Sequence, residues 1–295
     1  MKADIHSHSS NSDGTWNVKK LLEEAERLEL ECYAVTDHDN LEGAMQALEF
    51  SSIFSGILIP GLEISTKVDR RTVHLLAYFP KIDHDAIPDV HEVLDKVKTS
   101  RSRRMEKMIE KGIETGFKIT MDEILTEVTK DGSSADIIAR PHLARVLVQK
   151  GYAGDMDEAF DKYLSEGKPL YVERFTLEYK DWMELIHTNS GIVVWAHPLF
   201  YQEEDIEFLR KSFDLLYKER IDGIEMVYPY NKRRGKLDRK YIKKGQAFLR
   251  QKIEENNLLW TSGGDFHGDN GILGFAEIDD GMVDRLLSKI GFDCK

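Results

Sequence analysis

Residues 1–39 read MKADIHSHSSNSDGTWNVKKLLEEAERLELECYAVTDHD and contain a strand-helix-strand pattern. Residues 3–6 and 32–36 are short apolar runs, and each predicts a strand. Residues 17–30 place leucine and alanine at helical spacing, which predicts an amphipathic helix between the two strands. Repeated units of this kind imply a mostly parallel sheet or a barrel.

The same alternation continues towards the carboxyl terminus. Further apolar runs predict five more strands, at residues 57–63, 72–79, 192–196, 223–227 and 258–262. Helical spacing recurs at residues 182–188, 206–217 and 239–256. Seven strands are too many for a single β-α-β unit, so this α/β pattern favours a barrel.

Histidine, aspartate and glutamate residues gather at the predicted carboxyl ends of these strands. In strand order they are His6, Asp37 with His38, Glu63, His197 and Asp265. His74 is an exception, because it falls inside its strand. Barrels of this kind place their catalytic groups at the carboxyl ends of the strands, so we expect these side chains to converge.

The segment at residues 83–167 interrupts the alternation of strands and helices. It is charged, and helical spacing appears at residues 101–117, 121–130, 141–150 and 156–165. We expect a helical insertion that acts as a substrate cap within a barrel domain formed by residues 1–82 and 168–295. A long decorated loop is the alternative, and the periodicity argues against it.

The bulk composition excludes several classes of protein. The 295 residues carry a net charge of −12, which argues against a broad footprint on long nucleic acid. No apolar run is long enough to span a membrane. The chain opens directly on the first motif, so we expect no signal peptide. With two cysteines, Cys32 and Cys294, we expect a cytoplasmic protein without a disulfide framework.

The candidate ligands are nitrogen and oxygen donors, with no cysteine among them. Such a set favours a hydrolytic site for Mn, Fe or Zn over a structural thiolate site. Residues i and i+2 of a strand point to the same side, so His6 and His8 can reach one metal, as can Asp265 and His267. The alternatives remain open: Glu63 and Asp13 as surface carboxylates, and His74 as a core histidine.

Several motifs resemble those of the PHP (polymerase and histidinol phosphatase) phosphoesterase family. They are His6-Ser7-His8, Ser12-Asp13-Gly14, Thr36-Asp37-His38-Asp39, Gly61-Leu62-Glu63, His74, Ala196-His197-Pro198 and Gly264-Asp265-Phe266-His267. The resemblance implies a distorted seven-stranded (β/α) barrel with three divalent metal ions. Motifs of the insertion, among them Arg140-Pro141-His142, resemble the branch of 3′,5′-nucleoside bisphosphate phosphatases and 5′-3′ exoribonucleases.

The resemblance also implies a ligand set and a mechanism. The first ion would be held by His6, His8, Glu63 and Asp265, the second by Glu63, His74 and His197, and the third by Asp13, His38 and His267. His142 is the alternative to His197 at the second ion. A hydroxide held by the ions at Glu63, His197 and Asp265 would attack phosphorus. Asp37 and Asp39 are expected to orient His38 and its loop.

Substrate contacts are expected from the insertion and from the loop after the sixth strand. Arg140 is the best candidate for a phosphate contact, because a guanidinium matches two phosphate oxygens, with a surface arginine as the alternative. It precedes Pro141, so we expect it at the extended start of a helix. His142 is expected to face the substrate, and Tyr228 and Asn231 are expected to contact a base or leaving group.

These features predict a metal-dependent phosphoesterase acting on nucleotides: nucleoside 3′,5′-bisphosphates, AMP or short 5′-phosphorylated RNA. Its partner would be this small phosphorylated substrate, with no long nucleic acid, membrane or obligate protein partner. Histidinol-phosphate phosphatase is the alternative enzyme. A metal-binding module without turnover is the alternative from another class. Amide hydrolysis or deamination fits a phosphate-binding arginine less well.

Overall fold

The computed structural model describes residues 2–130, 138–173, 175–200, 205–230, 237–268, 271–274 and 280–291. Contacts between residues divide the chain into two compact units. Unit 1 comprises Met1–His91 and Leu177–Lys295, and unit 2 comprises Glu92–Thr176. Both bounds of unit 2 lie later in the sequence than those of the insertion expected at residues 83–167.

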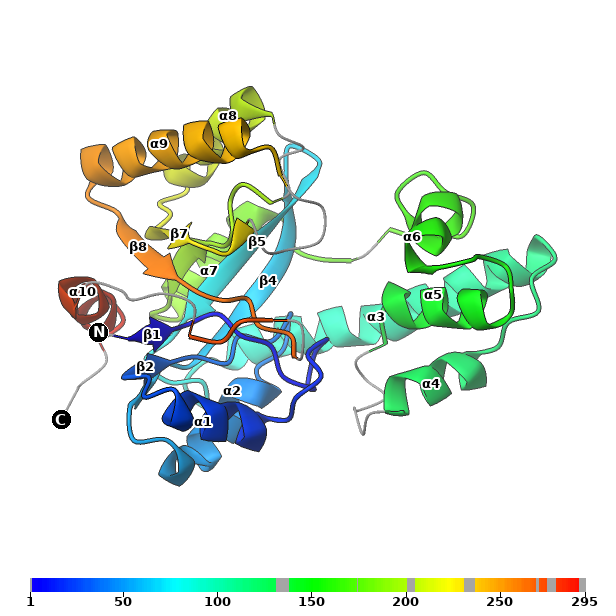
Figure 1. Ribbon diagram of the computed structural model, residues 1–295, viewed down its shortest axis with the longest axis horizontal. Helices are drawn as coiled ribbons and strands as arrows, with labels where there is room; N and C mark the ends of the chain where they lie inside the picture. The colour runs from blue at the N-terminus through cyan, green and yellow to red at the C-terminus, as the bar shows by residue number, and fades with distance from the viewer. Residues whose placement is uncertain are drawn as a thin grey trace. The chain divides into compact units, whose positions relative to one another are not determined.

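Unit 1 contains two sheets, and together with its helices they form a mixed α/β fold (Figure 1). The first sheet is parallel, with β1 (Ala3–Asp4), β2 (Cys32–Tyr33) and β3 (Ile57–Leu58) in that order. The second has the order β4 (Gly61–Val68), β5 (Arg71–Tyr78), β6 (Ile192–Trp195), β7 (Gly223–Val227) and β8 (Leu259–Ser262). The pairs β4–β5 and β5–β6 are antiparallel, whereas β6–β7 and β7–β8 are parallel.

The described residues form eight strands in two sheets, so the expected barrel of seven strands is not confirmed. The apolar run at residues 57–63 is divided at Ile59 and Pro60 into β3 and the start of β4. Proline has no N–H to donate to a sheet, so it interrupts the pairing there. The antiparallel pairing of β4 and β5 also departs from the mostly parallel arrangement that we expected.

Two isolated pairs beyond the named strands connect the two sheets. Ser7, after β1, pairs with Phe266, after β8, and His38, after β2, pairs with Glu63 of β4. Strands of both sheets also contribute side chains to one buried cluster, which α10 (Asp280–Lys289) completes. The segments that follow β1 and β8 therefore lie side by side, and the segment that follows β2 lies beside Glu63 of β4.

Helices cover the two sheets of unit 1. The first, α1 (Val18–Arg27), begins after Asn17, whose side chain accepts a hydrogen bond from Lys20 N at 2.9 Å. The others are α2 (Glu42–Glu49), the short η1 (Ser51–Ile53), α7 (Tyr179–Thr188), α8 (Ile206–Lys218), α9 (Arg239–Asn256) and α10. Figure 1 shows α1 and α2 beside β1 and β2, and α8 and α9 near β7 and β8. The sequence patterns did not predict α2 or α10.

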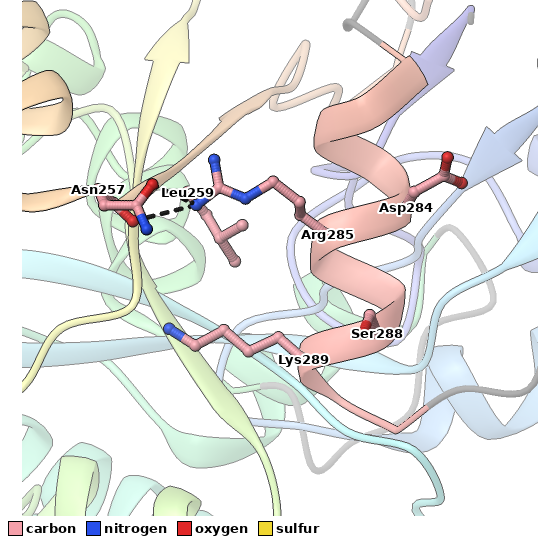
Figure 2. A pocket seen from close by; sticks show the side chains of 6 residues that line it. All are labelled: Asn257, Leu259, Asp284, Arg285, Ser288 and Lys289. Atoms are coloured by element: carbon pink, nitrogen blue, oxygen red, sulfur yellow. Dashed lines mark hydrogen bonds between the residues drawn. The ribbon is translucent and has the colours of Figure 1, made fainter.

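A pocket of about 470 Å³ lies between α10 and the start of β8 (Figure 2). Its two cationic side chains come from α10 and are both engaged. Arg285 donates hydrogen bonds to the backbone and side-chain oxygens of Asn257, each at 3.1 Å. Lys289 pairs with Asp222 at 2.6 Å. These contacts fasten α10 to the strands, so we assign the pocket a structural role.

Unit 2 is helical. Its elements are α3 (Pro88–Glu114), which begins in unit 1, α4 (Met121–Thr129), α5 (Arg140–Gln149), α6 (Met156–Ala159) and the single π turn η3 (Phe160–Leu164). A capping box between Thr120 and Glu123 starts α4. Apolar side chains from these helices form a core of their own, with Met108, Ile124 and Leu143 fully buried. The helices expected from periodicity are all present.

Candidate metal centre

Glu63 of β4 is fully buried and lies at the centre of a group of imidazoles. Its Oε1 is 2.8 Å from both His74 Nδ1 and His197 Nε2. Its Oε2 is 3.0 Å from His38 Nδ1. Burial alone would raise the pKa of Glu63, but the neighbouring histidines hold it well below its usual range. Glu63 is therefore a carboxylate anion whose two oxygens face different sets of nitrogen atoms.

A second cluster surrounds the His6-Ser7-His8 segment that follows β1. His8 Nε2 lies 3.2 Å from Glu63 Oε2 and 3.0 Å from Asp265 Oδ1. His6 Nε2 lies 3.3 Å from the same oxygen of Glu63 and 3.6 Å from Asp265 Oδ1. Burial alone would lower the pKa of His8, but Asp265 and Glu63 raise it to about 10. A divalent cation can replace the proton that these groups share.

The third cluster includes Asp13, which is partly exposed. Asp13 Oδ1 is 3.2 Å from His267 Nε2 and 3.8 Å from His8 Nδ1. Asp13 Oδ2 is 3.8 Å from His38 Nε2. The loop after β1, the segment after β2 and the segment after β8 thus meet, and each brings one or two of these side chains.

The potential ligand atoms fall into three overlapping groups, each with its atoms within 4.8 Å of one another. They are His8, Asp13, His38 and His267; then His6, His8, Glu63 and Asp265; then His38, Glu63 and His74. His197 lies beside the third group through its contact with Glu63. All the expected ligands of unit 1 are thus brought together, whereas His142 belongs to unit 2.

The donor set fits divalent cations such as Mn, Fe or Zn, because it combines imidazole nitrogens with carboxylate oxygens. Among the described residues, Glu63 Oε2 and His8 Nδ1 are buried without a hydrogen-bond partner. Buried polar atoms in folded proteins are nearly always bonded, so an unpartnered carboxylate oxygen amid imidazoles is typical of a metal ligand.

The backbone is unusual at three points of the centre. Asp39, His197 and Asp265 have φ angles of 48°, 26° and 46°, in the left-handed region. Residues with a β-carbon rarely adopt such angles, which cost of order 1–3 kcal/mol each. All three follow strand ends, so the strained turns direct the neighbouring side chains towards the centre.

Glu225 of β7 belongs to the centre although the sequence analysis missed it. It is fully buried, and its Oε1 lies 2.9 Å from His6 Nδ1. Its Oε2 accepts a hydrogen bond from His197 N at 2.7 Å. A carboxylate that accepts from the second nitrogen of a ligand histidine fixes the tautomer and the ring. The available signal was an acidic residue within the apolar strand sequence GIEMV.

Asp37 has a different role from the one expected. It accepts hydrogen bonds from Ser9 N and Ser9 Oγ at 2.7 Å each and from Ser12 Oγ at 2.5 Å. A β-carbon at Gly43 would lie 1.8 Å from Asp37 Oδ2, so α2 approaches this carboxylate through a glycine. Asp37 thereby fixes the loop between His8 and Asp13. Asp39 accepts from Ser65 N at 3.1 Å.

Tyr228 follows β7 and is buried, with 5% of its surface exposed. Its hydroxyl donates a hydrogen bond to Asp265 Oδ2 at 2.9 Å. This position suits orientation of the Asp265 carboxylate better than stacking on a base. Asn231, the other expected contact in this loop, lies outside the described residues.

Arg140 and His142 lie in unit 2, at the start of α5. Arg140 is the first helical residue, preceded by Ala139 in an extended conformation, so it is not itself extended as we expected. Its Nη1 donates to Leu164 O at 3.2 Å, and its guanidinium lies 5.6 Å from the ring centre of Phe160. His142 Nδ1 accepts from Ala139 N at 3.0 Å.

A family model with the description PHP domain matches residues 4–262. The chain belongs to the PHP family. A 5′-3′ exoribonuclease from Haemophilus influenzae is 30% identical to it over 267 residues, which cover 90% of each chain. A 3′,5′-nucleoside bisphosphate phosphatase from Chromobacterium violaceum is 30% identical over 195 residues, which cover 66% of each chain.

Solved structures extend the comparison to the whole fold. A protein described as a metal-dependent phosphoesterase, from Bifidobacterium adolescentis, has a TM-score of 0.77 at 27% identity, covering 97% of this chain and 96% of that one. A Chromobacterium violaceum protein described as an amidohydrolase, with bound sulfate and no metal, has a TM-score of 0.77 at 25% identity, covering 98% and 97%. This PHP protein is a metal-dependent hydrolase of phosphoric esters. No helix within the described ranges combines the length and apolar character that crossing a membrane requires.

Proposed function

We propose that this PHP protein hydrolyses phosphate esters of nucleotides: nucleoside 3′,5′-bisphosphates, AMP or short 5′-phosphorylated RNA. The observation that carries the proposal is the set of histidines and carboxylates gathered around buried Glu63. The substrate class follows relatives described as a 5′-3′ exoribonuclease and a 3′,5′-nucleoside bisphosphate phosphatase. Both descriptions name a phosphate ester of a nucleotide or nucleic acid.

We further propose that the centre holds three divalent ions. His6, His8, Glu63 and Asp265 would hold the first, Glu63, His74 and His197 the second, and Asp13, His38 and His267 the third. The short distances within each group support this division, as does the position of Glu63 between two groups. Mn, Fe and Zn all accept such ligands, and availability selects among them in cells.

Divalent ions held by these residues would supply Lewis acidity and would activate water as a nucleophile at neutral pH. The chain's own residues prepare the site for that chemistry. Glu225 holds the proton of His6 on Nδ1 and leaves Nε2 facing Glu63 and Asp265. Tyr228 fixes Asp265 through its second oxygen. Burial of Glu63, His6 and His8 keeps water away from their charges, which strengthens every electrostatic interaction there.

We propose that unit 1 is a distorted (β/α)7 barrel in which β3 and β4 act as one element broken at Pro60. The pairs Ser7–Phe266 and His38–Glu63 support closure, because they connect the first sheet with β8 and with β4 of the second sheet. The buried cluster shared by strands of both sheets supports it as well. A barrel would account for the convergence of strand ends at one centre.

Unit 2 is proposed to act as a substrate cap. Arg140 and His142 would contact a phosphate of the substrate, since a guanidinium donates two parallel hydrogen bonds to phosphate oxygens. Asn231, in the loop after β7, is proposed as a further substrate contact. Tyr228 would act on substrate only through Asp265, because its ring is buried.

A panel of substrates tests the proposal with purified protein supplied with Mn. Phosphate release should be measured from adenosine 3′,5′-bisphosphate, AMP and histidinol phosphate, together with degradation of a short 5′-phosphorylated RNA. We expect turnover of at least one nucleotide substrate, abolished by chelation and restored by metal. Turnover of histidinol phosphate alone, or of no substrate, would contradict the proposal.

A further inference from the structure

A groove of about 650 Å³ lies within unit 2, between residues 92–107 of α3 and the segment that carries Val172 and Phe175. Two hydrogen bonds fix this segment along the helix. Arg104 Nε donates to Val172 O at 2.6 Å, and Lys111 Nζ donates to Tyr171 O at 2.7 Å. The two walls of the groove, α3 and this segment, are therefore joined by hydrogen bonds.

Besides Lys96, the α3 wall carries two exposed cations, Arg103 and Lys107. They lie four residues apart, so they face the same side of the helix. Within the described part of the chain, neither side chain has an ion pair or a hydrogen bond. Two charges with a common direction and no internal partner form a local anion-binding surface on an acidic protein.

The rest of the groove is close to neutral. At the amino-terminal end of α3, Lys96 pairs with Glu92 at 2.5 Å. Two further carboxylates, Asp95 and Glu173, line the groove. Among the described residues of the lining, the positive charge is therefore concentrated at Arg103 and Lys107, about two to three helical turns from Lys96.

The opposite wall exposes an aromatic ring. Phe175 is 48% exposed, one of few large apolar side chains with that exposure among the described residues. Beside it, Val172 adds apolar surface to the groove. Single-stranded nucleic acids are bound by this combination, because aromatic faces stack on bases while Arg and Lys hold phosphates. Duplex RNA would not fit the ring, since its bases are already stacked.

We propose that this groove binds single-stranded RNA, with phosphates on Arg103 and Lys107 and a base on Phe175. The proposal rests on the proposed function, in which a short RNA is one class of substrate, and it assigns that RNA a second contact surface. Two cations allow only a short footprint, which agrees with the net charge of −12.

A binding experiment tests the groove separately from hydrolysis. Full-length protein in EDTA is titrated into a fluorescent RNA of about six nucleotides without a 5′-phosphate, and affinity is followed by anisotropy over a range of salt. Arg103→Ala/Lys107→Ala should weaken binding. It should also reduce the slope of log affinity against log salt by about 1.4, since each phosphate contact contributes about 0.7. Phe175→Ala should weaken binding about fivefold or more without changing the slope.

The control is Lys243→Ala/Arg250→Ala, which removes one exposed lysine and one exposed arginine from α9 in unit 1. It should bind RNA like the wild type. Equal affinities and slopes for the wild type, the control and the Arg103→Ala/Lys107→Ala variant would overturn the proposal. Circular dichroism shows whether each variant is folded. If Phe175→Ala is unfolded, Phe175→Leu replaces it in the binding experiment, because leucine keeps an apolar side chain but has no ring to stack on a base.

Hydrolysis assays distinguish failure of the groove from failure of the proposed function. A nucleoside 3′,5′-bisphosphate has no further nucleotide to occupy the groove, so Arg103→Ala/Lys107→Ala should hydrolyse it at the wild-type rate. Groove-dependent binding of RNA without any nucleotide turnover would leave the groove standing and reject the proposed function. Turnover of nucleotides together with unchanged RNA binding in the groove variants would support the proposed function and reject the groove.

Discussion

His6 Nδ1 lies 2.9 Å from Glu225 Oε1, and both side chains are fully buried. The other oxygen of Glu225 accepts a hydrogen bond from His197 N. One carboxylate therefore orients the imidazole of His6, after β1, and the backbone of His197, which has a positive φ angle after β6. Burial makes an unpaired carboxylate costly, and both of its oxygens are paired. The contact of His6 Nδ1 with Glu225 orients the imidazole so that Nε2 faces Glu63 and Asp265.

Replacing Glu225 with glutamine should weaken metal binding by about 10- to 100-fold. An amide has a single acceptor oxygen, so it cannot accept from both His6 Nδ1 and His197 N. If its NH2 group faces His6, the imidazole proton moves to Nε2 and blocks the atom that faces Glu63 and Asp265. Competition with a metal-binding dye measures the affinity. Exposed Glu184→Gln on α7 is the matched control, and equal affinity in the two variants would contradict this role.

His8→Ala should abolish phosphoesterase activity with little change of fold. His8 lies within two of the three potential ligand groups, so its loss disturbs both. Metal content by elemental analysis should fall together with activity, whereas the circular dichroism spectrum should remain close to that of the wild type. His84→Ala, which alters a histidine outside every ligand group of the described residues, is the control. Near-normal turnover by His8→Ala would be evidence against the assigned centre.

Arg140→Ala should raise KM for nucleotide substrates by about tenfold or more, because a charge-assisted hydrogen bond is worth roughly 1.5–3 kcal/mol. Steady-state kinetics with a nucleoside 3′,5′-bisphosphate measure the change. Arg145→Ala removes an exposed arginine from the same helix and should leave KM unchanged. An equal effect of the two substitutions would show that only the net charge of α5 matters.

Asp222→Asn should lower the free energy of unfolding by about 1–3 kcal/mol at pH 7. Asp222 Oδ2 accepts from Val193 N and lies 2.8 Å from His187 Nε2, and Oδ1 pairs with Lys289. Burial alone would raise the pKa of Asp222, but these partners hold it below its usual value of 3.8.

The pH dependence of this stabilisation follows from the sign of that shift. A carboxyl whose pKa is lower in the folded state stabilises the protein above its unfolded pKa of about 3.9, and the stabilisation is lost as pH falls through the folded pKa. Urea denaturation at several pH values should therefore show the difference between wild type and Asp222→Asn narrowing below about pH 4. A difference that stays constant down to pH 2 would exclude this ionic contribution.

Much of the centre was predictable because its ligands recur at strand ends. His6, His38, Glu63, His197 and Asp265 each close or follow an apolar run, and the geometry of β-α units brings such ends together. The helical runs of unit 2 were equally visible in the spacing of their apolar residues.

The antiparallel hairpin of β4 and β5 was not predictable from its turn. Val68 pairs with Arg71, and the two residues between them, Asp69 and Arg70, have φ angles of 47° and 70°. Positive φ at both central residues defines a turn that normally carries Asn-Gly or Asp-Gly. Arginine in the second position conceals the turn, so the continuation of β4 from Glu63 to Val68 was missed, whereas the start of β5 was predicted to within one residue.

Glu225 was missed for a different reason. A single acidic residue in a short strand gives no periodic signal, and its partners are 219 and 28 residues away in the sequence. Only the fold brings His6 and His197 to the same carboxylate. Residues that orient ligands therefore need a structure, whereas most of the candidate ligands follow strand ends, with Glu63 and His74 lying inside β4 and β5.

Each pair of the three potential ligand groups shares one residue. His8 belongs to the group with Asp13 and to the group with Asp265. Glu63 belongs to the group with Asp265 and to the group with His74, and His38 belongs to the group with His74 and to the group with Asp13. A shared side chain that turns towards one ion alters what it offers to the next. If each group holds an ion, as proposed, binding at one position would change the affinity at the other two, and thermodynamic reciprocity would require the same factor in both directions. The protein should accordingly fill as a cooperative unit, and its titration with metal should depart from the sum of independent binding curves.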